Sequence, residues 1–339
     1  MYFDSFHLAL LSIFLIIIIF LIIIGIRAKR LNNNIGYWNS LFPAGILILS
    51  IISYIFKTFQ LGHPVLIYPL DLILIGHFFV MLGVQQIYIY RVKRDKSSDE
   101  NIDVITKSAK EFTVSQESGR KALHLLGFLL IPPYFGMGIF YYNILRVILD
   151  FFNIPAMNIN PILIPQTMAL LGIMVAFIFV IIPEIYRIYN HKYCLLQRFM
   201  HILRKEEVNS IGPHINMIIG MIIPIILISE PFLAIGTMFS GIMADGAAGV
   251  IGKKWGKKIF NKRNHKTIEG LTAGILTSFF TSFIFFIFIY SLWICIIFSS
   301  VCCLIFGILD YISLRISDNI LTPVISGLSI AIVNGLIFF

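Results

Sequence analysis

The sequence predicts an all-α integral membrane protein with about nine or ten membrane-spanning helices. Three observations support this fold class. Of the 339 residues, 58% are hydrophobic and only 13% are charged, the mean hydropathy is +0.90, and long apolar segments recur along the chain. Soluble proteins carry about 25% charged and roughly 45–50% apolar residues. The composition therefore argues against a soluble enzyme, a secreted disulfide-linked module and a disordered scaffold.

The apolar segments predict where the chain crosses the membrane. A helix needs about 20 apolar residues to cross a hydrocarbon core of about 30 Å. The segments that we assign as spans are 8–26, 41–56, 65–90, 124–142, 162–186, 214–229, 232–251, 271–309 and 320–339. The segment 271–309 carries no charged residue and would be about 60 Å long as one helix. We expect it to reverse direction near Tyr290–Ser291, which brings the count to ten spans.

The basic residues predict the orientation. No Lys or Arg precedes the first span, whereas Arg27, Lys29 and Arg30 follow it, as is typical of a retained span with its N-terminus outside. Alternation from there places 24 of the 26 Lys and Arg residues on the cytoplasmic side, with Lys57 and Arg146 as the exceptions. In a soluble protein a net charge of +9 would suggest nucleic acid. Here its placement orients the chain, and we expect no nucleic-acid partner.

The distribution of polar residues predicts three regions. Residues 1–90 form a three-span N-terminal region of unknown role, and residues 91–117 form a charged cytoplasmic linker. Residues 118–339 form a C-terminal membrane domain in which ionisable residues recur at the ends of spans. Ionisable groups at such positions need a partner or a task, so we expect the function to lie in this domain.

Two short motifs precede the centre of this domain. Arg120, Lys121 and His124 can share one helical face because of their spacing, and such a face would bind an anion. Ordinary positive flanking of a span explains them equally. Glu184 and Arg187, three residues apart, predict an ion pair. A structural salt bridge is at least as good an explanation of that pair as a catalytic role.

A stripe of small residues surrounds one carboxylate in the span 232–251 and beyond it. Gly241, Asp245, Gly249, Gly252 and Gly256 recur at steps of three and four. Small residues let another helix or a ligand approach closely. Close helix packing would explain the glycines. It does not explain an aspartate inside a span, because a buried carboxylate is costly without a cation or another partner.

Seven basic residues follow this stripe within fourteen positions: Lys253, Lys254, Lys257, Lys258, Lys262, Arg263 and Lys266. Attraction to anionic lipid head groups is one explanation. Together with Asp245 they also meet the needs of a nucleoside triphosphate, which are a carboxylate for Mg²⁺ and cations for the phosphate oxygens. The segment is not a P-loop, because Ala247 and Lys254 stand where that motif requires Gly and Ser or Thr.

The last motif lies at the entry to the final span, where Asp318 and Asn319 precede Pro323. Helix capping alone would explain these residues. The orientation deduced from loop charge places all of these motifs near the cytoplasmic face, where nucleotides are available.

In these motifs the sequence resembles the membrane-bound polyprenol kinase family, which includes dolichol kinase, phytol kinase and the CTP-dependent diacylglycerol kinases. The matching elements cover roughly residues 115–339 in the family's order. They are Arg120-Lys121-x-x-His124, Glu184-x-x-Arg187, Asp245-Gly-Ala-Ala-Gly-x-x-Gly252-x-x-x-Gly256, Lys266-Thr267-x-Glu269-Gly270 and Asp318-Asn319-x-x-x-Pro323. The block from Asp245 to Gly270 is shared with phosphatidate cytidylyltransferases, and the first and last elements favour the kinases.

The resemblance implies an enzyme that transfers the γ-phosphate of CTP or another nucleotide, with Mg²⁺ or another divalent cation, to a lipid alcohol. The acceptor would be a long-chain isoprenoid alcohol or diacylglycerol. The expected metal ligand is Asp245, and Glu269 or His124 would orient or deprotonate the alcohol. The expected phosphate-binding residues are Arg120, Lys121, Gly249, Gly252, Lys253, Lys254, Lys257, Lys266 and Thr267. The expected supporting residues are Glu184, Arg187, Asp318 and Asn319.

Two alternatives remain open from the sequence. A cytidylyltransferase that joins CTP to a lipid phosphate would use the same metal and triphosphate chemistry. A membrane transporter would use Asp245 and Glu184 as ion sites within the membrane, and would be expected to carry charges near the midplane.

Overall fold

The computed structural model describes residues 5–66, 68–94, 131–134, 137–154, 161–196, 203, 207–261, 266–312, 314 and 316–338. The chain divides into two compact units. Unit 1 comprises Met1–Leu126 and Leu171–Ile219, and unit 2 comprises Gly127–Leu170 and Gly220–Phe339. Apart from one short hairpin of two strands, the regular structure of the described residues is helical. The predicted all-α fold is confirmed.

Eight helices in the described part of the chain are long and apolar enough to cross a membrane. They are α1 (Ser5–Arg30), α2 (Asn34–Leu61), α3 (Leu70–Arg94), α8 (Ile164–Tyr189, preceded by the 3-10 turn Pro161–Leu163), α10 (Pro231–Trp255), α11 (Ile268–Phe286), α12 (Leu292–Ile312) and α13 (Asp318–Phe338). A shorter apolar helix, α9, covers Pro213–Leu227. The chain is thus a polytopic membrane protein, as predicted.

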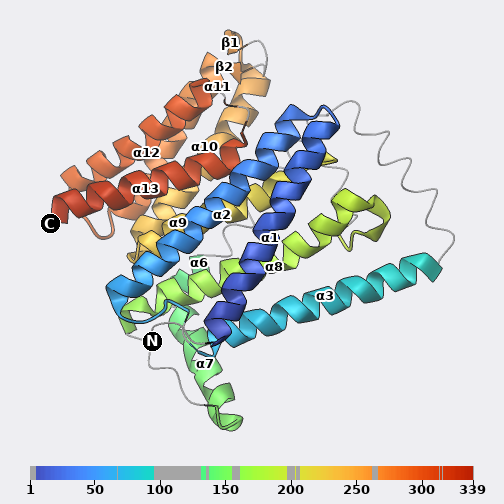
Figure 1. Cartoon of the computed structure of the whole chain (residues 1–339). Coiled ribbons are helices and arrows are strands. Elements are labelled where there is room, and N and C mark those ends of the chain that lie inside the picture. Colours follow the sequence, from blue (N-terminus) through green and yellow to red (C-terminus); the bar gives the residue numbers. More distant parts are fainter. Residues whose placement is uncertain are drawn as a thin grey trace. The chain divides into compact units, whose positions relative to one another are not determined.

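Unit 1 is built around the first three helices. The helices α1 and α2 pack side by side as a hairpin, and α1 also contacts α3 (Figure 1). Asn33 caps the start of α2 by accepting a hydrogen bond from the backbone N–H of Gly36, at 2.8 Å. Gly62 ends the same helix with φ of 76°, a left-handed conformation that glycine adopts without steric cost. The termini of α2 are therefore encoded locally.

The few polar side chains of the N-terminal spans are paired within unit 1. The Nδ1 atom of His7 lies 3.1 Å from Asp71 Oδ2, which joins α1 to α3. The amide of Gln86 donates to the hydroxyl of Tyr186 at 2.6 Å, and His77 Nε2 lies 3.2 Å from the carbonyl oxygen of Val175, which joins α3 to α8. His7 and Asp71 are buried, and buried polar groups need such partners, so this pair has a structural explanation.

Unit 2 is dominated by α10 to α13. The helix α10 contacts α11, α12 and α13 (Figure 1). The strands β1 (Ile259–Asn261) and β2 (Lys266–Thr267) pair antiparallel between α10 and α11. The helix α11 ends at Phe286 and α12 begins at Leu292, which confirms the reversal predicted near Tyr290–Ser291. Unit 2 also contains α6 (Ile131–Tyr134) and α7 (Met137–Phe151).

The helix α11 shows how unit 2 is adapted to lipid. Its small residues at steps of four, Gly270, Gly274, Ser278 and Ser282, are buried. Its large residues at the same step, Leu276, Phe280 and Ile284, are each 57% exposed. Membrane helices associate through small residues because large apolar side chains gain nothing by leaving lipid. The exposed stripe of α11 therefore faces lipid.

Three predicted boundaries differ from the structure. The helix α3 continues to Arg94, so the first four residues of the predicted linker 91–117 are helical. The helix α7 extends to Phe151, beyond the predicted end of a span at Tyr142. Residues 171–219, which the sequence assigns to the C-terminal domain, cluster with the N-terminal helices in unit 1. The predicted junction at 117/118 lies outside the described residues.

Candidate functional site

One charged cluster in unit 2 gathers residues from four elements, and we call it the Lys266 cluster. The ammonium of Lys266 in β2 donates to Asp310 Oδ1 at 2.7 Å and to Asp318 Oδ2 at 3.2 Å. It also donates to the backbone carbonyl of Asp310 at 3.2 Å. Asp310 lies in the last turn of α12, and Asp318 is the first residue of α13. One lysine thus links the ends of two membrane helices.

Asp245 of α10 is the third carboxylate of the Lys266 cluster. It acts electrostatically on Asp318, as Asp310 does. The Asp245 side chain is half-buried, two to three turns before α10 ends at Trp255. The predicted residues Asp245, Lys266 and Asp318 are therefore brought together, although 73 positions of sequence separate the first from the last.

The carboxylates hold Lys266 in its charged form. Burial of the Lys266 side chain opposes the charge, but the negative charges of Asp318 and Asp310 outweigh burial and raise the pKa of Lys266 above its ordinary value. The side chains of Lys266, Asp310 and Asp318 are 21%, 10% and 28% exposed. The cluster therefore lies at the edge of unit 2's core, and two carboxyl groups contact the Lys266 ammonium directly.

Asp310 was missed by sequence reasoning. It directly follows the predicted span 271–309, and none of the sequence motifs includes it. The available signal was an acidic residue in the last turn of a long apolar segment, which is a position where a buried charge needs a partner. The partner is Lys266, 44 positions away, and that distance along the chain conceals the pairing.

Two predicted residues at the start of α11 take part in local hydrogen bonds. Thr267 is the N-cap of α11, and its hydroxyl accepts a hydrogen bond from the backbone N–H of Gly270 at 3.2 Å. Both carboxylate oxygens of Glu269 lie 3.3 Å from the backbone nitrogen of Lys258, which donates to them. These contacts fix the base of the hairpin. The predicted catalytic role of Glu269 and the predicted phosphate contact of Thr267 stay predictions.

The predicted glycine stripe lies where α10 meets α11 and α13. A Cβ atom added at Gly241 would lie 2.5 Å from the side chain of Thr322, and one added at Gly252 would lie 3.0 Å from Thr267 Oγ1. A Cβ added at Gly256 would lie 2.5 Å from the side chain of Thr267. These glycines therefore serve close packing of α10, whereas Gly249 is half-buried and its predicted ligand contact stays a prediction.

The lysines that follow the stripe lie on the surface. Lys253, Lys254 and Lys257 are exposed. The ammonium of Lys254 lies 4.7 Å from the centre of the Trp255 ring. Their predicted contact with nucleotide phosphates stays a prediction. Of the remaining predicted residues in unit 2, Asn319 is half-buried in the first turn of α13.

Glu184 and Arg187 form the predicted ion pair, in unit 1. Arg187 Nε and Nη2 donate to the two carboxylate oxygens of Glu184 at 2.7 and 2.8 Å. The guanidinium also donates to the backbone carbonyls of Glu207, Val208 and Ser210. Arg187 is 1% exposed and Glu184 is 4% exposed. The pair therefore organises the segment that leads into α9.

The same carboxylate reaches the start of α9. Glu184 Oε1 accepts a hydrogen bond from the backbone N–H of Gly212 at 2.7 Å. A Cβ atom added at Gly212 would lie 3.0 Å from that oxygen and 2.7 Å from the ring of His214. Each nitrogen of Arg187 already donates to the protein, so the structural explanation of this motif is the better supported one.

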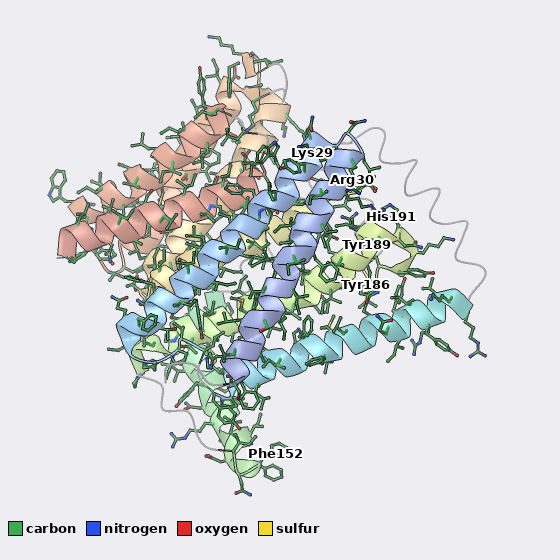
Figure 2. The ribbon with its side chains drawn as sticks, in the orientation of Figure 1. Lys29, Arg30, Phe152, Tyr186, Tyr189 and His191 are labelled. Atoms are coloured by element: carbon green, nitrogen blue, oxygen red, sulfur yellow. The ribbon has the colours of Figure 1, made fainter. Side chains whose placement is uncertain are left out.

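Aromatic and basic side chains meet at one end of unit 1. Figure 2 shows Tyr186, Tyr189 and His191 at the end of α8 and in the 3-10 turn His191–Tyr193 that follows it. The guanidinium of Arg27 lies 5.1 Å from the centre of the Tyr189 ring, and the ammonium of Lys93 lies 5.7 Å from that of Tyr193. Such residues are typical of the boundary between membrane and water.

The motif Arg120, Lys121 and His124 lies outside the described residues, as do Lys262 and Arg263. The sequence predicts Asp245 as a metal ligand. Among the described residues, no three His, Cys, Asp or Glu side chains converge tightly enough to hold a metal ion by themselves. Magnesium in nucleotide-dependent enzymes is commonly held by one or two carboxylates together with substrate phosphates, and the carboxylates of the Lys266 cluster fit that mode.

The comparisons with known proteins leave the family open. The chain matches no protein-family model, no curated protein and no solved structure. The resemblance to polyprenol kinases therefore rests on the motifs quoted above, and any function rests on the chemistry of the Lys266 cluster.

Proposed function

We propose that the chain is an integral membrane lipid kinase that transfers the γ-phosphoryl group of CTP or another nucleoside triphosphate to a lipid hydroxyl. The observation that carries the proposal is the Lys266 cluster, in which Asp310 and Asp318 bind one lysine at the ends of two membrane-length helices and Asp245 acts electrostatically on Asp318. Carboxylates and a cation at a membrane boundary suit a substrate with a charged head and an apolar tail.

Phosphoryl transfer asks the protein mainly to position the reactants and to neutralise charge. The bond between the γ-phosphorus and the oxygen that bridges it to the β-phosphate breaks. A new bond forms from that phosphorus to the lipid oxygen, the hydroxyl gives up its proton, and the nucleoside diphosphate leaves. We assign Asp245 to a divalent cation and Lys266 to the phosphate oxygens, with Glu269 or His124 as the candidate for the hydroxyl proton. Mg²⁺ supplies charge neutralisation when it is bound with the nucleotide.

The lipid acceptor is proposed from the surroundings of the cluster. Asp310 and Asp318 belong to α12 and α13, and both of these helices are long and apolar enough to span the membrane. A long-chain isoprenoid alcohol or diacylglycerol can leave its tail in the bilayer while its hydroxyl reaches the ends of these helices. We propose that this end faces the cytoplasm, because basic residues gather in the loops on that side.

The experiment is transfer of label from γ-labelled CTP or ATP to polyprenols, phytol-like alcohols or diacylglycerol, in membranes that contain the protein. We expect a labelled lipid and release of nucleoside diphosphate. Release of pyrophosphate instead would identify the cytidylyltransferase alternative. If no donor and acceptor pair gives a lipid product, the kinase proposal is wrong, and nucleotide-independent solute flux into proteoliposomes would then favour a transporter.

A matched pair of variants tests the assigned carboxylate. Asp245→Asn should abolish transfer because it removes the proposed cation ligand while keeping the side chain's shape. Asp150→Asn changes an exposed carboxylate on α7 of the same unit and should leave transfer unchanged. Full activity of Asp245→Asn would remove Asp245 from the site.

A further inference from the structure

The end of α10 and the start of β1 form a surface that is both basic and apolar, and we call it the basic hairpin surface. It consists of Lys253, Lys254, Trp255, Lys257, Lys258 and Ile259, all of which are exposed. Four of these residues are lysines, and Trp255 and Ile259 are 57% and 52% exposed.

We propose that the basic hairpin surface docks on anionic phospholipid head groups of the leaflet in which α10 ends. The sequence alone left these lysines between two sources of phosphate, a nucleotide and a lipid. The structure favours the lipid because it exposes apolar side chains among the lysines of this one segment, with Lys254 directly against the Trp255 ring. The inference does not rest on the proposed kinase activity.

The length of α10 sets the depth of this surface. Its 25 residues span about 37 Å at 1.5 Å per residue, compared with a hydrocarbon core of about 30 Å. The last turn of α10 therefore reaches the head-group layer. Only eleven residues, 257–267, separate Gly256 from α11, which is itself long and apolar enough to return through the membrane. The hairpin consequently stays at the level of the head groups.

The mixture of side chains fits that layer. Tryptophan is enriched at the boundary between membrane and water because its ring is amphipathic, and lysine near a membrane surface is attracted to anionic lipid. The ammonium of Lys254 lies over the Trp255 ring at 4.7 Å. A nucleotide in water would give no reason to expose Trp255 and Ile259, whereas the head-group layer accommodates both kinds of side chain.

Local contacts hold the surface in a fixed orientation. The ring of Phe260 in β1 stacks on Tyr311 of α12 with centroids 5.4 Å apart. The backbone N–H of Lys258 donates to Glu269, and its carbonyl accepts from Ile268 at 2.9 Å. Glu269 is thus an acidic neighbour of Lys258.

Interaction with the helix dipole of α10 explains only two of the four lysines. Lys253 and Lys254 lie in the last turn of α10, where cations interact favourably with the helix dipole. Lys257 and Lys258 lie beyond the end of the helix at Trp255, where that effect fades. Their charges need another explanation, and anionic lipid provides it.

The experiment uses Trp255 as a depth reporter. The chain has three tryptophans, and Trp38 and Trp293 are 41% and 76% exposed, so both can be changed to phenylalanine with little loss of packing. The full chain carrying Trp38→Phe and Trp293→Phe is reconstituted in vesicles of phosphatidylcholine and phosphatidylglycerol. Bromine is placed near the head-group end of the acyl chains of either the anionic or the zwitterionic lipid.

We expect stronger quenching of Trp255 fluorescence when the brominated lipid is the anionic one. Replacing Lys253, Lys254, Lys257 and Lys258 by glutamine should abolish this difference while leaving quenching by both lipids. The control double variant Lys29→Gln and Arg30→Gln removes exposed basic residues of unit 1 and should keep the difference.

Three results would overturn the inference. Equal quenching by the two brominated lipids in the parent would show no preference for anionic head groups, and absence of quenching would show that Trp255 does not lie in the membrane boundary. Recovery of Trp255 fluorescence on addition of Mg²⁺ and CTP, with the anionic brominated lipid present, would assign the lysines to the nucleotide instead. None of these readouts depends on turnover.

Discussion

Each unit contains a cluster of acidic and basic side chains: Glu184 with Arg187 in unit 1, and the Lys266 cluster in unit 2. The two clusters differ in burial and in how far their hydrogen-bonding groups are already used by the protein. In unit 1, Arg187 donates to Glu184 and to three backbone carbonyls, and it is 1% exposed. In unit 2, the side chain of Lys266 is 21% exposed and meets two carboxylates, while Asp245 acts on one of them as a third. The first cluster is closed, because its donors are already used by the protein. The second is partly exposed to solvent, and its lysine is shared between two carboxylates.

The difference separates a structural pair from a candidate site. A buried arginine whose donors are satisfied rigidifies the segment that it holds, and removing it leaves a carboxylate stranded. A partly exposed lysine between two carboxylates costs less to remove, because solvent already screens the pair. The sequence left a structural and a catalytic explanation open for Glu184 and Arg187, and the burial and the hydrogen bonds of the pair favour the structural one.

The largest loss of stability should come from breaking the Glu184–Arg187 pair. Arg187→Met leaves Glu184 buried without its partner, and removal of one partner of a buried pair costs about 3–5 kcal/mol. We expect a large loss of thermal stability in detergent, measured by intrinsic fluorescence. Arg187→Lys keeps the charge but not the bidentate geometry, and it should lose less thermal stability. Arg91→Met, at the exposed end of α3, should lose little thermal stability. A melting temperature close to wild type for Arg187→Met would contradict the closed cluster.

The next largest loss of stability should come from overpacking at Gly270, close to the Lys266 cluster in the sequence. A Cβ atom added at Gly270 would lie 2.8 Å from the carbonyl oxygen of Ala248, whereas one added at Gly246 would meet nothing within 4 Å. Gly270→Ala should therefore cost about 1–3 kcal/mol by overpacking. Gly246→Ala should be neutral or stabilising, because alanine is the better helix former. Thermal unfolding of the two variants measures this, and equal effects would refute the role of Gly270 in packing.

Breaking the Lys266 cluster should affect function more than stability. Lys266→Met removes a partly exposed pair, and we expect a loss of about 1–2 kcal/mol together with loss of lipid phosphorylation. Because the folded-state pKa of Lys266 is raised, its contribution to stability is complete below its unfolded pKa of about 10.4. It is lost only as pH rises through the folded-state value. The stability difference between wild type and Lys266→Met should thus be constant from pH 7 to 9, and a decline across that range would contradict the pairing.

The smallest effect concerns a titration beside the closed cluster. Burial of His191 and then the charge of Arg187 lower the pKa of its imidazole below the ordinary value. A lowered folded-state pKa means that stability is complete above the unfolded value of about 6.5 and declines as pH falls through the folded-state value. We expect a lower melting temperature at pH 5.5 than at pH 7.5, and a smaller difference in His191→Gln. An unchanged difference in that variant would assign the pH dependence to another group.

The sequence by itself determined the membrane class, the positions of most spans and the reversal between α11 and α12, because hydrophobicity and charge act on each segment separately. It also determined the Glu184–Arg187 pair, since three residues along a helix bring two side chains together. The helix ends predicted from the sequence were less accurate where a helix continues into charged residues, as α3 does to Arg94.

Only the tertiary structure decided what these groups do. The partner of Lys266 comes from 44 positions away in Asp310, and the remaining donors of Arg187 are used by a segment about 20 residues further on. The glycines of α10 acquire a packing role only when α11 and α13 are placed against them. Such pairings depend on how distant helices meet, and no local pattern in the chain records that.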